Sequence, residues 1–481
     1  MKITSYPTHY ELTPYVAGYH RNLEVSLSVW NQPYYRWEPL GYMILGQTLY
    51  LPKGMDSEIL AQTFNMQIFP GELYKERYVK RKYNMIKPPR DDLQRDAIDF
   101  IIGRGQYPYT RKQTQVSINL KPGDGKTYCT IHGIIESGRR AIIISHTSKI
   151  RSQWYEEFLE TTDVPEEQLM VIDGVSDMEK IINSKKDADF FFINHQTFQT
   201  AIRNKGYEFV ISFFNKIETG IKVYDEAHYE FASIVKLDML SNIPKTYYLT
   251  ATFRRTNSRE NRIFGTAFAS VFKFDNRMSA SGETRKHTIY CPVEYNSQPL
   301  QEDIMSMFNK LGLFSGYNYI KYELSDQYAY EKLYEALDLV FGMIKETPGR
   351  ILIVNPKIEC CEIIREVVRK ICPNRSIGTI HSHNTQDQNI ENSSCDIIVS
   401  TIKSNGVGVN IKNIRFLINL EPFSSTVTAE QLRGRLREYS STEYTYFFDL
   451  VDVGIPKAAD FLKRRTRYYK KECVKIVHYK V

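Results

Sequence analysis

A segment that could bind a polyphosphate lies at residues 120–127, with the sequence LKPGDGKT. It follows an apolar run that predicts a strand and precedes a stretch with helical spacing. Glycines permit the tight turn that brings backbone N–H groups onto phosphate oxygens. We expect Lys126 to reach the β- and γ-phosphates of a nucleotide and Thr127 to bind Mg²⁺. The rest of the predicted phosphate loop is Pro122, Gly123, Asp124 and Gly125.

A pair of carboxylates lies at the end of another apolar run, in residues 223–228, VYDEAH. Hydrolysis of a nucleoside triphosphate needs a carboxylate to hold Mg²⁺ and a group that activates water. Asp225 is predicted to hold Mg²⁺, and Glu226 to orient and deprotonate the attacking water. His228 is placed to sense a neighbouring domain. An Asp-Glu pair alone is typical of a solvated loop, but behind a phosphate loop it indicates a hydrolytic site.

The apolar runs that would position these residues divide the chain into three parts. Residues 1–87 contain short strand-like runs between Pro and Gly, which predicts a β-rich N-terminal module that we expect to bind DNA. From residue 88, continuously apolar strands alternate with helical stretches, and a second such series starts near Arg350. We assign residues 88–280 to one domain and residues 281–481 to the other. This alternation is typical of parallel sheets covered on both faces. We therefore predict an α/β chain with two tandem domains behind a small α+β module.

Composition excludes several other classes of protein. Of the 481 residues, 42% are apolar and 25% charged, which is ordinary for a globular protein. The longest apolar runs are far shorter than the roughly 18 residues that span a membrane, so no membrane partner is expected. The first residues of the sequence lack the apolar core of a signal peptide. The seven cysteines include no CxxC pair, which fits reduced thiols. Both observations predict a cytoplasmic location (the host cytoplasm if the protein is viral). The net charge of +7 only weakly favours a nucleic-acid partner.

The order of these motifs resembles that of superfamily 2 helicases, with residues 225–228 as a DEAH box. The resemblance covers residues 88–480 and implies two RecA-like domains, ATP with Mg²⁺, and a nucleic-acid partner. Gln94 is similar to the glutamine that reads adenine in the family, although Asp91 stands where the family places an Arg. Gln153 and Trp154 match a Gln-Trp pair of the family.

Further motifs of the resemblance imply contact with nucleic acid or coupling of hydrolysis to movement. In the first domain they contribute Thr147, His195, Thr250 and Thr252, with Thr250 and Thr252 in the coupling motif. In the second domain they contribute Thr401, followed by Gly406 and Gly408, which let the backbone approach a phosphate. Gly408 stands where many relatives carry an Asp.

Residues 431–437, QLRGRLR, resemble the motif that supplies arginine fingers to the nucleotide. Gln431 and Arg435 match the motif, and Arg435 is expected to stabilise charge on the γ-phosphate. The second finger of the family falls on Glu438. Arg437, one position earlier, either replaces it or forms a salt bridge on its own helix.

Two basic runs interleaved with tyrosines, residues 75–83 and 463–471, could contact a nucleic-acid backbone or remain solvated.

Within the superfamily, the chain is most similar to phage UvsW-type and XPB-like DNA helicases. This likeness implies DNA rather than RNA, 3′→5′ movement, and branched substrates in recombination, repair or fork processing. We expect a monomer that binds single-stranded and branched DNA. The alternatives are an RNA helicase, a duplex-DNA translocase of a restriction-type system, and a non-catalytic scaffold that binds nucleic acid.

Overall fold

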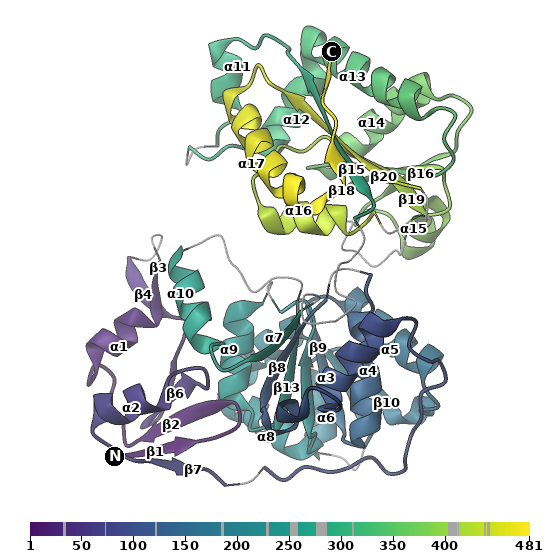
Figure 1. Ribbon diagram of the computed structural model, residues 1–481. Coiled ribbons are helices and arrows are strands. Elements are labelled where there is room, and N and C mark those ends of the chain that lie inside the picture. The colour runs from purple at the N-terminus through teal and green to yellow at the C-terminus, as the bar shows by residue number, and fades with distance from the viewer. Residues whose placement is uncertain are drawn as a thin grey trace. The chain divides into compact units, whose positions relative to one another are not determined.

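The computed structural model divides into two compact units, Met1–Glu283 and Thr284–Val481, each described here by itself (Figure 1). The structure describes residues 1–31, 35–72, 74–120, 123–183, 187–227, 230–250, 258–275, 286–309, 312–402, 411, 413–436, 439 and 443–481. Among these residues, no helix has both the length and the apolar character needed to cross a lipid bilayer.

The chain begins with a five-stranded sheet of order β5-β6-β2-β1-β7, in which only the β1–β7 pair is parallel. Its strands are β1 (Lys2–Ser5), β2 (His9–Thr13), β5 (Met43–Leu45), β6 (Thr48–Pro52) and β7 (Ile68–Pro70). Two short helices, α1 (Arg21–Ser26) and α2 (Ser57–Phe64), accompany it, and β3 (Ser28–Asn31) and β4 (Arg36–Pro39) form a separate antiparallel hairpin. This β-rich region confirms the predicted character of the N-terminal module.

The N-terminal module packs directly onto the first α/β domain. Met43 is buried in a hydrophobic cluster that also contains Ile142 and Ile144 of that domain. A Cβ atom added to Gly54 would lie 2.4 Å from the carbonyl oxygen of Ala267, so the two backbones touch at this point. The two regions therefore share one core, and residues on both sides of position 87 belong to the same compact unit.

The first α/β domain is built on a seven-stranded, all-parallel sheet of order β10-β11-β9-β12-β13-β8-β14. The strands are β8 (Gln115–Asn119), β9 (Ala141–Ser145), β10 (Leu169–Ile172), β11 (Phe190–Asn194), β12 (Ile221–Tyr224), β13 (Lys245–Leu249) and β14 (Phe272–Asp275). The α-helices of this domain are α3 (Asp92–Ile102), α4 (Lys126–Ser137), α5 (Ser148–Thr161), α6 (Val175–Asn183), α7 (His195–Lys205), α8 (Tyr207–Ile217), α9 (Phe231–Leu240) and α10 (Ser258–Ala267). Figure 1 shows helices on both faces of the sheet.

Continuous apolar strands arise because both faces of this sheet are covered. In β9, Ile142 and Ile144 belong to one hydrophobic core, while Ala141 and Ile143 belong to the core on the opposite face. Alternate side chains of a strand point to opposite faces, so apolar residues are needed at successive positions. Because all strands are parallel, their carboxyl ends share one edge, where the segments after β8, β9, β11, β12 and β13 gather.

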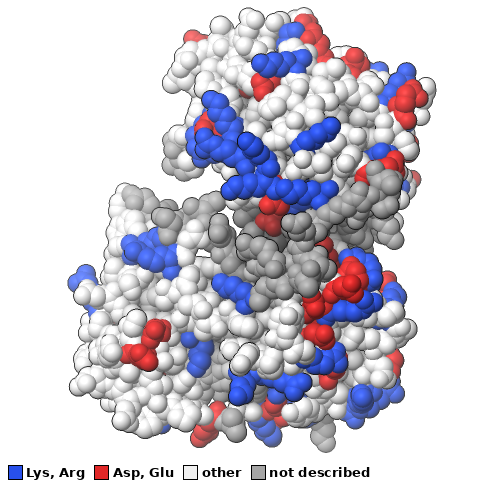
Figure 2. Space-filling model, in the orientation of Figure 1, with Lys and Arg blue, Asp and Glu red and all other residues white. Residues whose placement is uncertain are grey.

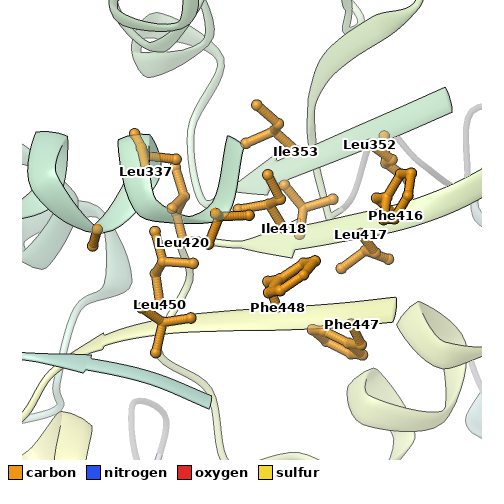
Figure 3. Packing of buried hydrophobic residues seen from close by; sticks show 14 of the residues in the cluster. Leu337, Leu352, Ile353, Phe416, Leu417, Ile418, Leu420, Phe447, Phe448 and Leu450 are labelled. Carbon is orange, nitrogen blue, oxygen red and sulfur yellow. The ribbon is translucent and has the colours of Figure 1, made fainter. Parts of the chain in front are cut away.

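The second unit is an independent parallel sheet of order β17-β18-β16-β19-β20-β15-β21, with β22 also paired to β15. Its strands are β15 (Thr288–Tyr295), β16 (Arg350–Asn355), β17 (Ile377–Ile380), β18 (Ile397–Thr401), β19 (Ile414–Asn419), β20 (Thr445–Asp452), β21 (Lys475–Ile476) and β22 (Tyr479–Lys480). Its helices are α11 (Gln301–Ser306), α12 (Gly316–Ser325), α13 (Gln327–Ile344), α14 (Ile358–Ile371), α15 (Gln386–Asn392), α16 (Thr426–Arg433) and α17 (Pro456–Glu472). Figure 3 shows its central strands packing through Leu352, Phe416, Leu417, Phe447 and Phe448. The predicted fold class is confirmed.

The basic run 75–83 lies along the first α/β domain and meets acidic residues there. Arg77 donates a hydrogen bond from Nε to Glu218 Oε2 at 2.5 Å. Tyr83 is buried and its hydroxyl donates to Asp189 at 2.6 Å. Part of this run therefore fastens the chain to its own domain, while Lys80 and Lys82 stay exposed.

Candidate active site

The predicted phosphate loop connects β8 to α4 and uses two glycines in the left-handed region. Gly123 has φ 92° and Gly125 has φ 85°, values that side chains with a Cβ rarely adopt. Gly125 is the N-cap of α4, and no side chain in the described part of the loop caps it. The first N–H groups of α4 and the positive end of its dipole thus meet at the loop, which fits an anionic ligand. Pro122 lies outside the described residues.

Gln94 is packed against this loop. Asp91 caps α3 by accepting a hydrogen bond from the Gln94 backbone at 2.9 Å. The Gln94 side chain accepts from the Arg90 backbone at 2.8 Å and donates to the Asp124 carbonyl at 3.3 Å. A Cβ atom on Gly125 would lie 2.2 Å from Gln94 Nε2, so the close contact requires glycine. The structure places Gln94 beside the phosphate loop, while adenine reading by it stays a prediction.

Asp225 follows the central strand β12 and is held by hydrogen bonds on both carboxylate oxygens. Trp154 Nε1 donates to Oδ2 at 2.7 Å, and the Glu226 backbone N–H donates to Oδ1 at 2.9 Å. Burial, followed by the charge of Glu226, raises the pKa of Asp225 to about 6. Burial and a neighbouring carboxylate both disfavour the charged form of Asp225, and a bound divalent cation would favour that form.

Glu226 and Lys126 come together from segments far apart in the sequence. Lys126 Nζ lies 3.9 Å from Glu226 Oε1, and Thr127 occupies the adjacent position in the first turn of α4. Glu226 has φ 47°, a left-handed conformation that costs free energy in a residue other than glycine and is frequent at functional sites. The structure therefore assembles Lys126, Thr127, Asp225 and Glu226 at one edge of the sheet.

The oxygen donors of this edge fit Mg²⁺ held jointly with a nucleotide. Within the described ranges, there is no group of three or more His, Cys, Asp or Glu side chains that could bind a metal ion by itself. Mg²⁺ typically takes one or two protein carboxylates and completes its shell with phosphate oxygens and water. Thr127 and Asp225 are suited to that limited role.

Trp154 has no site role in the sequence analysis, but the structure places it against Asp225. It lies on α5 with only 1% of its surface exposed, and its single N–H is directed at Asp225. The Gln-Trp pair was the available signal in the sequence, but it does not reveal which carboxylate the indole meets. We infer that Trp154 positions Asp225.

Replacing Trp154 by Phe is expected to raise the Mg²⁺ concentration for half-maximal ATP hydrolysis about 10- to 100-fold, the usual effect of losing an outer-shell partner. The ring remains to fill the core, but Asp225 loses its indole hydrogen bond. Titration of the ATPase rate with MgCl₂ measures the shift. Tyr155→Phe is the matched control, because it deletes a hydrogen bond to the surface residue Glu166. An unchanged Mg²⁺ requirement in Trp154→Phe would contradict the positioning role.

Two predicted contact residues of the first domain have defined surroundings. Thr147 caps α5, and its Oγ1 accepts a hydrogen bond from the Ile150 backbone at 3.3 Å. His195 is buried, its Nδ1 lies 3.0 Å from Ser233 Oγ, and its ring stacks on Tyr224 at 5.6 Å. Desolvation lowers the pKa of His195 to about 4, so the ring is neutral near pH 7. A side-chain contact between His195 and a nucleic acid would require the ring to leave this position.

Thr250 and Thr401 are both buried, Thr250 directly after β13 and Thr401 at the end of β18. Contact with nucleic acid, or coupling through these residues, stays a prediction. His228, Thr252, Gly406, Gly408 and Arg437 lie outside the described residues.

In the second unit, α16 and the turn after it carry the predicted finger motif. Gln431 lies on α16 and Arg435 follows its end, both half-buried. Arg433 is buried instead, with Nη2 3.8 Å from Glu472 Oε2 on α17. Of the three arginines in the motif, Arg433 therefore faces the interior of its own unit.

The C-terminal basic run forms α17, whose two sides differ. Arg465 is buried and donates from Nε to Asp449 Oδ2 at 2.7 Å, and Tyr469 is also buried. The exposed side carries five cations: Lys463, Arg464, Arg467, Lys470 and Lys471. Figure 2 shows Lys and Arg gathered where Figure 1 draws α17. The run thus serves both the core and a basic surface.

Two family models match the chain. Residues 76–255 match the family described as type III restriction enzyme, res subunit, and residues 329–438 match the helicase conserved C-terminal domain. This chain carries the two-domain core of a superfamily 2 helicase. The helicase domains imply ATP-dependent activity on nucleic acid, with ATP normally used together with Mg²⁺. No protein of curated function matches the helicase by sequence.

Solved structures resemble the helicase at low sequence identity. A putative HsdR subunit of a type I restriction enzyme from Vibrio vulnificus is 12% identical, with 81% of this chain and 68% of that chain covered and a TM-score of 0.51. S. cerevisiae Dbp5 bound to RNA is 12% identical, with 82% and 90% covered and a TM-score of 0.51. T4 UvsW aligns over 100% of this chain and 99% of its own at 15% identity, but its TM-score of 0.35 supports no inference. These likenesses concern the fold alone.

Proposed function

We propose that this helicase is an ATP-dependent DNA helicase or translocase that remodels or unwinds branched DNA in recombination, repair or replication-fork processing. The observation that carries the proposal is the meeting of Lys126 and Glu226 at 3.9 Å beside the buried Asp225, within a helicase core. This arrangement supports hydrolysis rather than a non-catalytic scaffold. The β-rich module packed on the first α/β domain, together with the Asp-Glu-Ala-His sequence at 225–228, supports the DNA assignment of UvsW-type and XPB-like helicases.

The residues have distinct tasks in the proposed reaction. Backbone N–H groups of residues 123–127 and the Lys126 ammonium bind the β- and γ-phosphates of ATP. Thr127 and Asp225 would hold Mg²⁺, which when bound neutralises charge on the phosphate oxygens. Glu226 accepts a proton from the attacking water.

The second unit supplies positive charge to the γ-phosphate. Arg435 is the proposed arginine finger, with Gln431 beside it in the motif and Arg437 as a second cation. Closure and opening of the two units with each ATP turnover would move the chain along DNA. Residues 1–87 are proposed as the accessory DNA-binding domain, 88–280 as the ATP-binding domain and 281–481 as the second helicase domain.

A duplex-DNA translocase of a restriction-type system is the second candidate. The observation that favours it is the match of residues 76–255 to the res-subunit family. A translocase would be stimulated by duplex DNA as strongly as by branched DNA, so the same assay separates the two candidates.

The ATPase rate is the quantity that tests the proposed function. The rate is measured in five parallel assays: without nucleic acid, and with single-stranded DNA, duplex DNA, a four-way DNA junction or RNA. We expect the rate to rise with DNA, most strongly with the junction. Lys126→Ala protein serves as the blank for contaminating hydrolysis. Stimulation by RNA alone would identify an RNA helicase, and no hydrolysis above the blank would leave a scaffold.

A further inference from the structure

The hairpin formed by β3 and β4 presents two tryptophans to solvent. Trp30 and Trp37 are directly opposed across the strands, with their rings at 5.4 Å and 70°. Their exposed fractions are 44% and 41%, although tryptophan has a large apolar surface that folding normally covers. The hairpin is a separate sheet of two strands, an arrangement that is marginally stable without outside contacts.

Arg259 of α10 provides such an outside contact. Its guanidinium lies 4.2 Å from the Trp37 ring centroid, and it donates to the carbonyls of Ser28 at 2.7 Å and Val25 at 2.8 Å. Stacking and two hydrogen bonds from one planar group fix the orientation of the hairpin on the first α/β domain. In the sequence, α10 begins at Ser258, shortly after Thr250 and the predicted coupling motif.

The charges around the two rings suit a polyanion. Arg36 lies on the hairpin, Arg262 is exposed on α10, and Figure 2 shows blue side chains where Figure 1 draws β4 and α10. Arg36 pairs with Glu38 at 3.1 Å, but this pair is exposed and such pairs contribute little free energy, so a phosphate can replace the carboxylate. Exposed aromatic rings next to arginines are the features by which proteins bind single strands, through base stacking and backbone contacts.

We infer that Trp30 and Trp37 form a stacking platform for an unpaired base of single-stranded DNA. Arg259 positions the platform, and Arg36 and Arg262 contact the adjacent phosphates. This assignment rests on the proposed function and names the part of residues 1–87 that touches the substrate. Base stacking is tolerant of sequence, so the platform would act on any unpaired strand at a branch.

Tryptophan emission tests the platform in the full-length protein, because the third tryptophan, Trp154, is buried. Titration with a 20-residue oligothymidylate should quench emission of the wild type. Anisotropy of a labelled oligothymidylate should show Trp37→Ala or Trp30→Ala binding roughly 5- to 150-fold more weakly, the effect of losing one stacked base. Tyr109→Ala is the matched control, since Tyr109 is 72% exposed on the first α/β domain but lies outside the hairpin, and its affinity should be unchanged.

An abasic strand of the same length separates stacking from a structural role of the rings. It keeps the phosphates but offers no base, so the loss caused by Trp37→Ala should vanish on it. The platform would be overturned if Trp37→Ala weakened binding of the oligothymidylate and of the abasic strand equally. It would also be overturned if the wild type bound oligothymidylate without a change in tryptophan emission. Quenching by RNA but not DNA would also overturn the assignment to DNA. The proposed function itself fails in a separate outcome, in which the wild type binds no nucleic acid and hydrolyses no ATP in the presence of any nucleic acid.

Discussion

Replacement of Glu226 by Gln is expected to lower the rate of ATP hydrolysis at least about 100-fold, because a general base contributes 10²- to 10⁴-fold. The amide keeps the size of the side chain but cannot accept the proton of the attacking water. Lys126, 3.9 Å away in the wild type, still binds the phosphates, and ATP affinity should therefore be retained. Single-turnover hydrolysis of ATP measures the rate, and binding of a fluorescent ATP analogue measures the affinity.

Glu208→Gln is the control for this substitution. Glu208 is an exposed carboxylate in the first turn of α8, so its replacement removes the same charge from the same domain without touching the phosphate loop. DNA binding should be unchanged in both variants, since neither carboxylate is assigned to the nucleic acid. Turnover of Glu226→Gln within tenfold of the wild type would remove its assignment as the base.

The sequence was sufficient to predict the parts of the site that depend on local geometry. Glycines at 123 and 125 predicted a turn, and both adopt the left-handed conformation that favours glycine. The continuously apolar runs predicted strands buried on two faces, and β9 divides its side chains between two cores. Lys126 and Glu226 meet because the strands before them are parallel and therefore end at the same edge of the sheet. Neither motif alone shows this meeting.

Contacts that depend on tertiary packing could not be predicted in this way. The hydrogen bond between Trp154 and Asp225 requires α5 to lie against the end of β12, and sequence spacing does not specify that placement. His195 was predicted as a contact residue from its motif, but the sequence does not show that its ring is enclosed by Tyr224 and Ser233. The basic run at 463–471 likewise looked uniform, whereas α17 turns Arg465 inward toward Asp449.

The N-terminal module illustrates the same limit. Pro88-Pro89 and a change of pattern place a boundary at residue 87, which stays a prediction. Composition does not indicate that Met43 packs with Ile142 in one core. Removing residues 1–87 would expose that core, so point substitutions such as Trp37→Ala are the suitable test of the module.

A buried polar network beneath β12 joins this module to the strand that ends before Asp225. Lys222 of β12 is fully buried, with Nζ 2.6 Å from Asp238 Oδ1 and 2.5 Å from Ser241 Oγ. Tyr224, the residue before Asp225, donates to Asp238 at 3.0 Å. Thr8 of the N-terminal module donates to the Ser241 carbonyl.

Lys222→Met is expected to reduce the free energy of unfolding by about 3–5 kcal/mol, because it leaves Asp238 buried without its cation. Burial alone lowers the pKa of Lys222, and the Asp238 carboxylate opposes that shift, so the two charges depend on each other. Urea unfolding followed by circular dichroism measures the loss. Lys236→Met, on α9 outside the network, is the control for losing one lysine charge.

The double variant Lys222→Met/Asp238→Leu identifies the cause of that loss. If the cost arises from an unpaired buried charge, removing both charges should restore most of the stability, because an apolar pair often replaces a buried ion pair without loss. Tyr224 and Tyr248 would then lose Asp238 as the acceptor of their hydroxyl protons, so restoration should be incomplete by about 1–3 kcal/mol for each hydrogen bond lost. Additive losses in the double variant would show instead that packing of the two side chains, and not their charge, supports the strand that ends at Asp225.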